Sequence, residues 1–127
     1  MSQAKVSANV RTISPHLSII DIQGEVNAFA ENILMEAFAR ANRPDVQVIA
    51  LNFAGLEYMN SSGIGLLITL LIRVQRQQKR LIAIGLSEHY RQIFELTRLN
   101  EAIALYANEA EAMTALNILK PQRRSEA

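Results

Sequence analysis

The chain contains an apolar strand-like run that leads into an apolar helix-like run, and this pair limits the folds open to it. Residues 46–53 (Val-Gln-Val-Ile-Ala-Leu-Asn-Phe) are typical of a buried strand. Residues 64–74 are almost uninterruptedly apolar and lie in a helix predicted over 62–78. Because both segments must be covered by other elements, they predict the interior of a layered α/β domain.

The remaining segments alternate in the same way. Strands are predicted over residues 6–12, 17–23, 81–85 and 103–106, and helices over 28–41, after Ser87 and from Asn108. A turn at residues 14–16 joins the first two strands as a hairpin, and residues 54–60 are expected to form a loop. The fold class is therefore α/β: a mostly parallel sheet of about five strands with an antiparallel edge, covered by about four helices.

Two finer expectations concern the later helices. The helix after Ser87 is predicted to turn four side chains inward, namely Tyr90, Ile93, Phe94 and Leu96. Asn108 and Glu111 resemble a capping box for the last helix.

At 127 residues the chain is expected to form one domain over residues 1–119, followed by a disordered polar tail over 120–127.

The charge balance and apolar runs favour a cytoplasmic protein. A net charge of +1 gives no general attraction to nucleic acid or anionic lipid, so neither partner is predicted. The residue 64–72 run is shorter than the roughly 20 residues needed to span a bilayer. The basic residues gather in two groups, which we interpret as a solvated helix end and a solvated tail: Arg73, Arg76, Lys79 and Arg80, and Lys120, Arg123 and Arg124.

The sequence offers little for enzyme chemistry. It has no cysteine and two distant histidines, His16 and His89, so no metal site and no cofactor are predicted. No dinucleotide, phosphate-loop or nucleophile-elbow motif is present. The carboxylates Asp21, Glu25 and Glu57 are interpreted as solvated surface groups. We therefore expect a protein that is not an enzyme.

The two adjacent serines are the remaining candidates for function. Ser61 and Ser62 fall where the helix over 62–78 begins, and a helix N-terminus favours a hydroxyl cap or a phosphate. A purely structural role is open at this point, with one serine as the N-cap and with Gly63 and Gly65 allowing the helix to pack closely on the sheet. A regulatory role is the alternative.

Three motifs together resemble the STAS domain family, in particular the bacterial anti-sigma-factor antagonists. They are Gly-Glu-Val-Asn at 24–27, Asn-Ser-Ser-Gly-Ile-Gly at 60–65 and Ile-Phe-Glu-Leu-Thr-Arg-Leu at 93–99. The resemblance extends from about residue 6 to residue 119. It implies a phosphorylation-controlled module that binds an anti-sigma-type serine/threonine kinase when unmodified, with a phosphatase restoring that state. It also implies that Ser61 is the phosphorylated residue.

The implied partner-binding residues surround that serine, and they are Asn27, Asn60, Ser61, Ser62, Gly63 and Ile64. The chain departs from the family at Asn27 and Asn60, where aspartate is usual. We expect these changes to keep the fold and the partner surface but to alter phosphorylation. The alternative function is a scaffold that does not switch, or an accessory subunit of a signalling assembly or membrane transport complex. The module is expected to be a monomer or a weak dimer.

Overall fold

Five strands form one sheet in the order β1-β2-β3-β4-β5. In the computed structural model, which describes residues 5–117, β1 runs antiparallel to β2, and every other neighbouring pair is parallel. The strands are β1 (Val6–Ser14), β2 (Leu17–Val26), β3 (Val48–Met59), β4 (Arg80–Ile84) and β5 (Ala104–Tyr106). The predicted fold class is thereby confirmed. The predicted tail over 120–127 lies outside the described residues.

The helices cover the two faces of the sheet unequally. They are α1 (Glu31–Ala41), α2 (Ser61–Arg76), α3 (Glu88–Leu96) and α4 (Glu109–Ala115), with short 3-10 turns η1 (Ala28–Ala30) and η2 (Leu99–Glu101). Buried side chains of α1, α2 and α3 share one core, as Leu34, Leu67 and Phe94 illustrate. Met113 of α4 belongs to a second, smaller core. This division follows from the parallel connections, whose common handedness places α1, α2 and α3 on one face.

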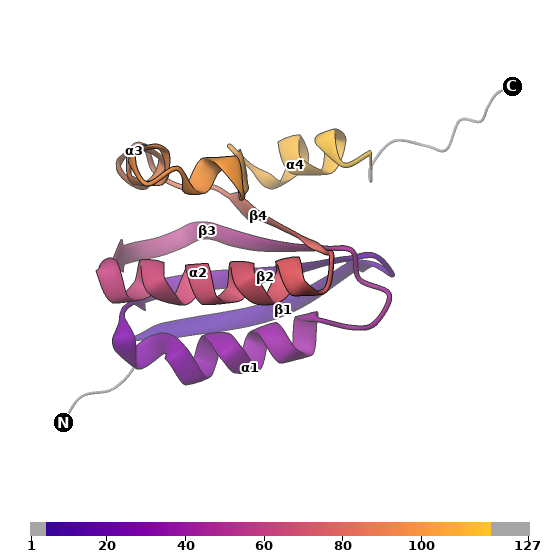
Figure 1. The fold of residues 1–127 in the computed structure, drawn as a ribbon, viewed down its shortest axis with the longest axis horizontal. Helices are drawn as coiled ribbons and strands as arrows, with labels where there is room; N and C mark the ends of the chain where they lie inside the picture. Colours follow the sequence, from indigo (N-terminus) through magenta and orange to yellow (C-terminus); the bar gives the residue numbers. More distant parts are fainter. Residues whose placement is uncertain (1–4, 118–127) are drawn as a thin grey trace, which may run out of the picture.

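The carboxyl ends of β2 and β3 and the beginnings of α1 and α2 meet at one end of the domain. This end lies on the left in Figure 1. Val26 at the end of β2 is the register partner of Met59 at the end of β3. The residues that follow these two strands therefore lie next to each other, at the edge of a parallel sheet where functional residues commonly gather.

The strand β3 is longer than predicted. Residues 54–59 continue the strand instead of forming a loop, and β2 runs beside them to Val26 rather than ending at Gln23. The pairing is irregular between Asp21 and Gln23 and again between Gly24 and Glu25. These irregularities disturb the alternation by which a strand is recognised, since each shifts which side chains face the core.

The prediction for Leu96 was wrong, because this side chain is 84% exposed. Helix α3 ends at Leu96, and Arg98 then takes a left-handed backbone conformation with φ of 65°. The turn brings Leu99 into the core instead. The inward positions of Tyr90 and Phe94 are confirmed, since both are buried.

The basic group at the end of α2 is only partly solvated. Lys79 is half-buried, and its Nζ donates hydrogen bonds to Asn42 Oδ1 at 2.7 Å and to the Arg43 carbonyl oxygen at 3.0 Å. Lys79 therefore ties the end of α2 to the end of α1. Within residues 5–117, no helix combines the length and the apolar character needed to cross a membrane.

Candidate functional site

Helix α2 is capped by Asn60 and not by a serine. The backbone of Asn60 is extended, and its side-chain Oδ1 accepts a hydrogen bond from the Gly63 amide at 3.0 Å. The Asn60 carbonyl oxygen also accepts from the Ile64 amide at 3.0 Å. The alternative in which a serine caps this helix is therefore excluded. Asparagine caps a helix as well as serine does, and Asn60 is the residue with the non-helical backbone.

The two serines therefore lie inside the first turn, with their hydroxyls available. Both residues are exposed, and neither hydroxyl forms a hydrogen bond within the part of the chain that the structure describes. The first turn of α2 contains no acidic side chain. Because the helix N-terminus carries a partial positive charge and free amide groups, added negative charge is favoured there.

Asn27 makes the corresponding cap at the end of the neighbouring strand. Its side-chain Oδ1 accepts a hydrogen bond from the Phe29 amide at 2.9 Å, so Asn27 caps η1. The two capped turns are joined through Val26, whose carbonyl oxygen accepts from the Asn60 amide at 3.2 Å. Asn27 thus follows directly on the residue that holds the start of α2.

Because Gly63 has no side chain, α2 lies closer to the sheet than it could with any other residue at this position. A Cβ atom at this position would overlap the Val26 carbonyl oxygen and would lie 2.7 Å from Met59 Cγ. The packing role expected of Gly63 is therefore confirmed. The same expectation for Gly65 was wrong, because Gly65 is exposed and a Cβ there would meet nothing within 4 Å.

The six predicted site residues differ in how much of them a partner could touch. Ser61 and Ser62 are exposed, Asn27 and Asn60 are half-buried, Ile64 is half-buried and packs against the core, and Gly63 is buried. The structure brings all six to the junction between β2, β3 and the start of α2. Gly63 and Ile64 pack below the exposed serines at this junction and support them.

An exposed apolar ridge continues from the serines along α2. It consists of Ile68 and Ile72, which are 39% and 44% exposed although the sequence predicts a helix covered on most sides. Ser61, Gly65, Ile68 and Ile72 are four, three and four residues apart, which places them along one side of a helix. Phe29, 58% exposed, extends the apolar surface at the other side of the junction. The helical spacing could have identified the ridge, but not its exposure.

A charged network lies away from the serines and corrects the interpretation of Asp21. This carboxylate is half-buried and accepts hydrogen bonds from Arg11 Nη2 at 2.9 Å and from Asn52 Nδ2 at 2.8 Å. Arg11 also donates to Glu109 at 2.8 Å. The hydrogen bond from Arg11, followed by that from Asn52, lowers the pKa of Asp21 against the opposing effect of burial. The network joins β1, β2, β3 and α4.

The two histidines make their contacts away from Ser61 and Ser62. His16 Nδ1 lies 3.0 Å from the Asp45 carbonyl oxygen, and the His89 ring packs edge-on against Tyr90 with ring centres 4.8 Å apart. No histidine forms a hydrogen bond to Ser61 or Ser62 among residues 5–117, so no imidazole is in place there to accept a proton from either hydroxyl. The same residues hold no group of three histidines, cysteines or carboxylates that could bind a metal.

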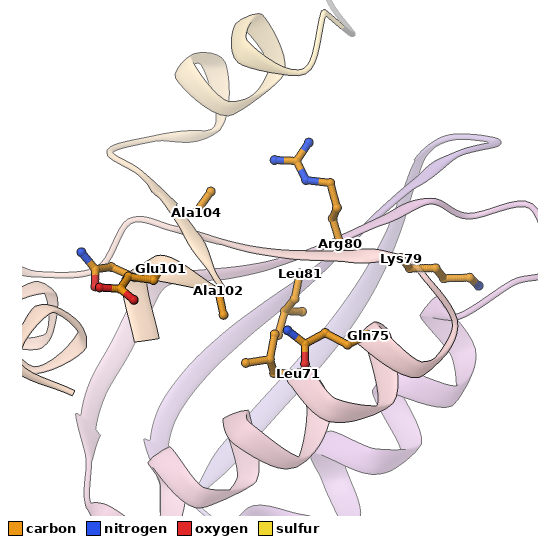
Figure 2. A pocket seen from close by; sticks show the side chains of 9 residues that line it. Leu71, Gln75, Lys79, Arg80, Leu81, Glu101, Ala102 and Ala104 are labelled. Atoms are coloured by element: carbon orange, nitrogen blue, oxygen red, sulfur yellow. The ribbon is translucent and has the colours of Figure 1, made fainter. Parts of the chain in front are cut away.

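A hollow of about 420 Å³ lies at the opposite end of α2 from the serines. Figure 2 shows that Leu71 and Gln75 reach it from α2, whereas the ends of Lys79 and Arg80 point away from these two side chains. Lys79 is already bound to Asn42 and Arg43. The polar groups do not converge on a common point, unlike those of a typical small-molecule site.

Comparison with known proteins gives the same family that the motifs indicate. A family model described as the STAS domain matches residues 7–112. The anti-sigma-B factor antagonist of Listeria monocytogenes is 26% identical over 96 residues, which cover 76% of this chain and 83% of that protein.

Two solved structures share the fold. The anti-sigma factor antagonist SpoIIAA in its unphosphorylated form has a TM-score of 0.65 and 22% identity, covering 87% of this chain and 98% of SpoIIAA. A sulfate transporter family protein from Wolinella succinogenes has a TM-score of 0.72 and 13% identity, covering 86% of this chain and 91% of its own. At such identities the likeness is one of fold alone, and the fold occurs in proteins of both descriptions.

Proposed function

The chain belongs to the STAS domain family, and from this premise we propose that it is a protein-binding module of the anti-sigma-factor-antagonist type, switched by phosphorylation of Ser61. Its partner is a serine/threonine kinase of the anti-sigma type, and a phosphatase returns the module to its binding form. The Listeria monocytogenes relative supports the general role by its description as an anti-sigma-B factor antagonist.

The proposal rests on the hydroxyl of Ser61, which is exposed and forms no hydrogen bond with any of residues 5–117. The capping hydrogen bond at this helix is made by Asn60, so a phosphate on Ser61 removes no described hydrogen bond of the fold. A phosphoserine adds about −1.5 to −2 charges near neutral pH. At the start of α2 this charge is favourable by about 0.3–1 kcal/mol, so the modified domain stays folded.

The same charge disrupts binding because of the surface that surrounds it. The partner-binding surface consists of the exposed serines, the half-buried Asn27 and Asn60, and the apolar ridge of Ile68 and Ile72. A partner that covers the ridge together with the serines removes water from Ser61. Burying an unpaired charge costs far more free energy than burying a neutral hydroxyl, so phosphorylation releases the partner.

The two asparagines adjust this switch. Asn27 and Asn60 supply the same capping oxygens that aspartate would supply, without its negative charge. A phosphate on Ser61 is thereby spared repulsion of about 1 kcal/mol for each unit-charge pair near 4 Å in water. A kinase that uses a carboxylate beside Ser61 for recognition loses that contact.

Phosphosite mapping by mass spectrometry, on protein recovered from its own cells, tests the acceptor. Phosphate on Ser61 is expected under at least one growth condition. Phosphate on Ser62 alone would contradict the assignment of the acceptor. Unmodified protein under all conditions would favour the scaffold or transport-accessory role.

Binding measurements test the switch itself. Partners are captured from the same cells with wild-type protein, and the affinity of each is then measured for Ser61→Ala and Ser61→Asp. We expect Ser61→Ala to bind normally and Ser61→Asp to bind at least about tenfold more weakly, a loss of about 1.4 kcal/mol. Thr114→Asp is the matched control, because it adds the same charge to an exposed hydroxyl residue on α4, outside this surface. Equal affinities for Ser61→Ala and Ser61→Asp would refute the switch.

A further inference from the structure

The end of β3 that leads to Ser61 extends beyond the support of β4. Pairing between β3 and β4 ends at Asn52 and Ile84, whereas β3 continues to Met59. Within the part of the chain that the structure describes, β2 alone pairs with β3 over residues 53–59. The backbone on the β4 side of this segment therefore needs other hydrogen-bond partners wherever it is buried.

Tyr90 supplies such a partner from helix α3. Its ring is buried in the same core as Met59, and its hydroxyl oxygen accepts a hydrogen bond from the Met59 amide at 2.8 Å. This bond is itself buried. Helix α3 lies at the end of the sheet where β3 terminates, on the left in Figure 1. One side-chain oxygen thus replaces the missing strand at the last residue of β3.

Met59 is two residues from Ser61, and it is held on three sides. Its amide is bound by Tyr90, its side chain packs where the absent Cβ of Gly63 would lie, and its register partner is Val26. The next residue, Asn60, then caps α2. We infer that Tyr90 is a positioning residue for the start of α2: its hydroxyl, acting through the Met59 amide, fixes the geometry in which Ser61 is presented.

Tyr90→Phe tests this inference because it removes one oxygen and keeps the ring. Tyr106→Phe is the matched control, since Tyr106 is a half-buried tyrosine that packs in the other core. The measurement is residue-resolved amide hydrogen exchange on the full chain. Exchange at buried strand amides, such as those of Ile20 and Leu51, measures the change in global stability. This change is subtracted from the change measured at each amide of the junction.

A positioning role and a simple packing role give different exchange patterns. The amides of Asn60, Gly63 and Ile64 are bonded to Val26 and Asn60 rather than to Tyr90. If Tyr90 positions the junction, all three should exchange about tenfold faster in Tyr90→Phe after the global correction, as expected for loss of one buried hydrogen bond. A change confined to the Met59 amide, or an equal change in Tyr106→Phe, would overturn the inference.

The consequence for phosphorylation rests on the proposed function. With a kinase that modifies Ser61, Tyr90→Phe should lower kcat/KM by a larger factor than Tyr106→Phe does. Equal kcat/KM in the two variants would overturn this consequence. If no kinase modifies Ser61, the proposed function fails, and the exchange pattern still decides whether Tyr90 positions the junction.

Discussion

The side-chain oxygen of Asn60 lies 3.0 Å from the Gly63 amide and caps helix α2 with a neutral group. Two hydroxyls that could have capped the helix are thereby left exposed within its first turn. The separation of the two tasks matters for a switch, because the residue that is modified is not the residue that holds the helix in place. A phosphate can be added or removed without loss of the cap.

Substitutions at Asn60 should separate the cap from the charge. Asn60→Ala should lower the free energy of unfolding by about 1 kcal/mol, the usual cost of a lost N-cap. Asn60→Asp should stay within about 0.5 kcal/mol of wild type at neutral pH, because its carboxylate keeps the cap and interacts favourably with the helix dipole. Chemical denaturation measures both. Ser62→Ala is the control and should be nearly neutral, and a loss equal to that of Asn60→Ala would assign the cap to the serine.

The two glycines of the first turns of α2 should respond in opposite directions to alanine. Gly63→Ala places a methyl group against the Val26 carbonyl oxygen and Met59 Cγ, so it should destabilise the domain by about 1–3 kcal/mol, as overpacking does. Gly65→Ala adds the same methyl group in open space and should stabilise it by about 0.5–1 kcal/mol. Thermal and denaturant unfolding of the pair test the close approach. Equal effects would contradict it.

The order of strands and helices could be predicted from the sequence because hydrophobic periodicity is local. The junction at residues 60–63 was also recognisable, but the cap was not, since Asn60, Ser61 and Ser62 are all good cap residues. The choice among them depends on where β3 ends, and that depends on pairing with β2 through two irregularities. The contact between Arg11 and Glu109 joins residues 98 apart, and no local pattern signals it.

The backbone just after α2 is strained at one residue, and a single substitution should relieve that strain. Gln78 has a φ of 59°, in the left-handed region. The Lys79 amide donates to the Val74 carbonyl oxygen, and the Gln78 amide donates to the Gln75 carbonyl oxygen. These two hydrogen bonds form a Schellman motif. Gln78→Gly should stabilise the domain by about 0.5–1 kcal/mol, because glycine takes this conformation without a Cβ penalty. Gln77→Gly is the control at a negative φ and should destabilise. The midpoint of denaturation compares them, and a loss of stability in Gln78→Gly would contradict the strain.

The exposed ridge on α2 gives a test of the partner surface that does not involve phosphorylation. Ile68→Asn should leave the free energy of unfolding within about 1 kcal/mol of the wild-type value, since this side chain is already partly in water. If the ridge is a central contact, the same substitution should weaken partner binding by about tenfold or more. Thr69→Asn changes the exposed neighbouring residue and should have little effect on affinity. Calorimetry with the captured partner measures both. Equal affinities for the two variants would exclude the ridge from the interface.

The network around Asp21 should make stability depend on pH in the acid range. Because hydrogen bonds from Arg11 and Asn52 lower the pKa of Asp21 in the folded state, folding favours its ionised form. The resulting stabilisation is complete above the unfolded pKa of about 3.9 and is lost as the pH falls through the lower folded value. Asp21→Asn should therefore be less stable than wild type at pH 7, by about 1 kcal/mol for a partly exposed pair.

The difference between wild type and Asp21→Asn should shrink steadily as the pH falls below about 4, because protonated Asp21 has lost its charge as well. Urea unfolding at a series of pH values measures this. Asp45→Asn is the control, because Asp45 is an exposed carboxylate that forms no salt bridge among the described residues. A difference for Asp21→Asn that is independent of pH would mean that packing, and not the charge of the carboxylate, joins β1 to β2 and β3 at this point.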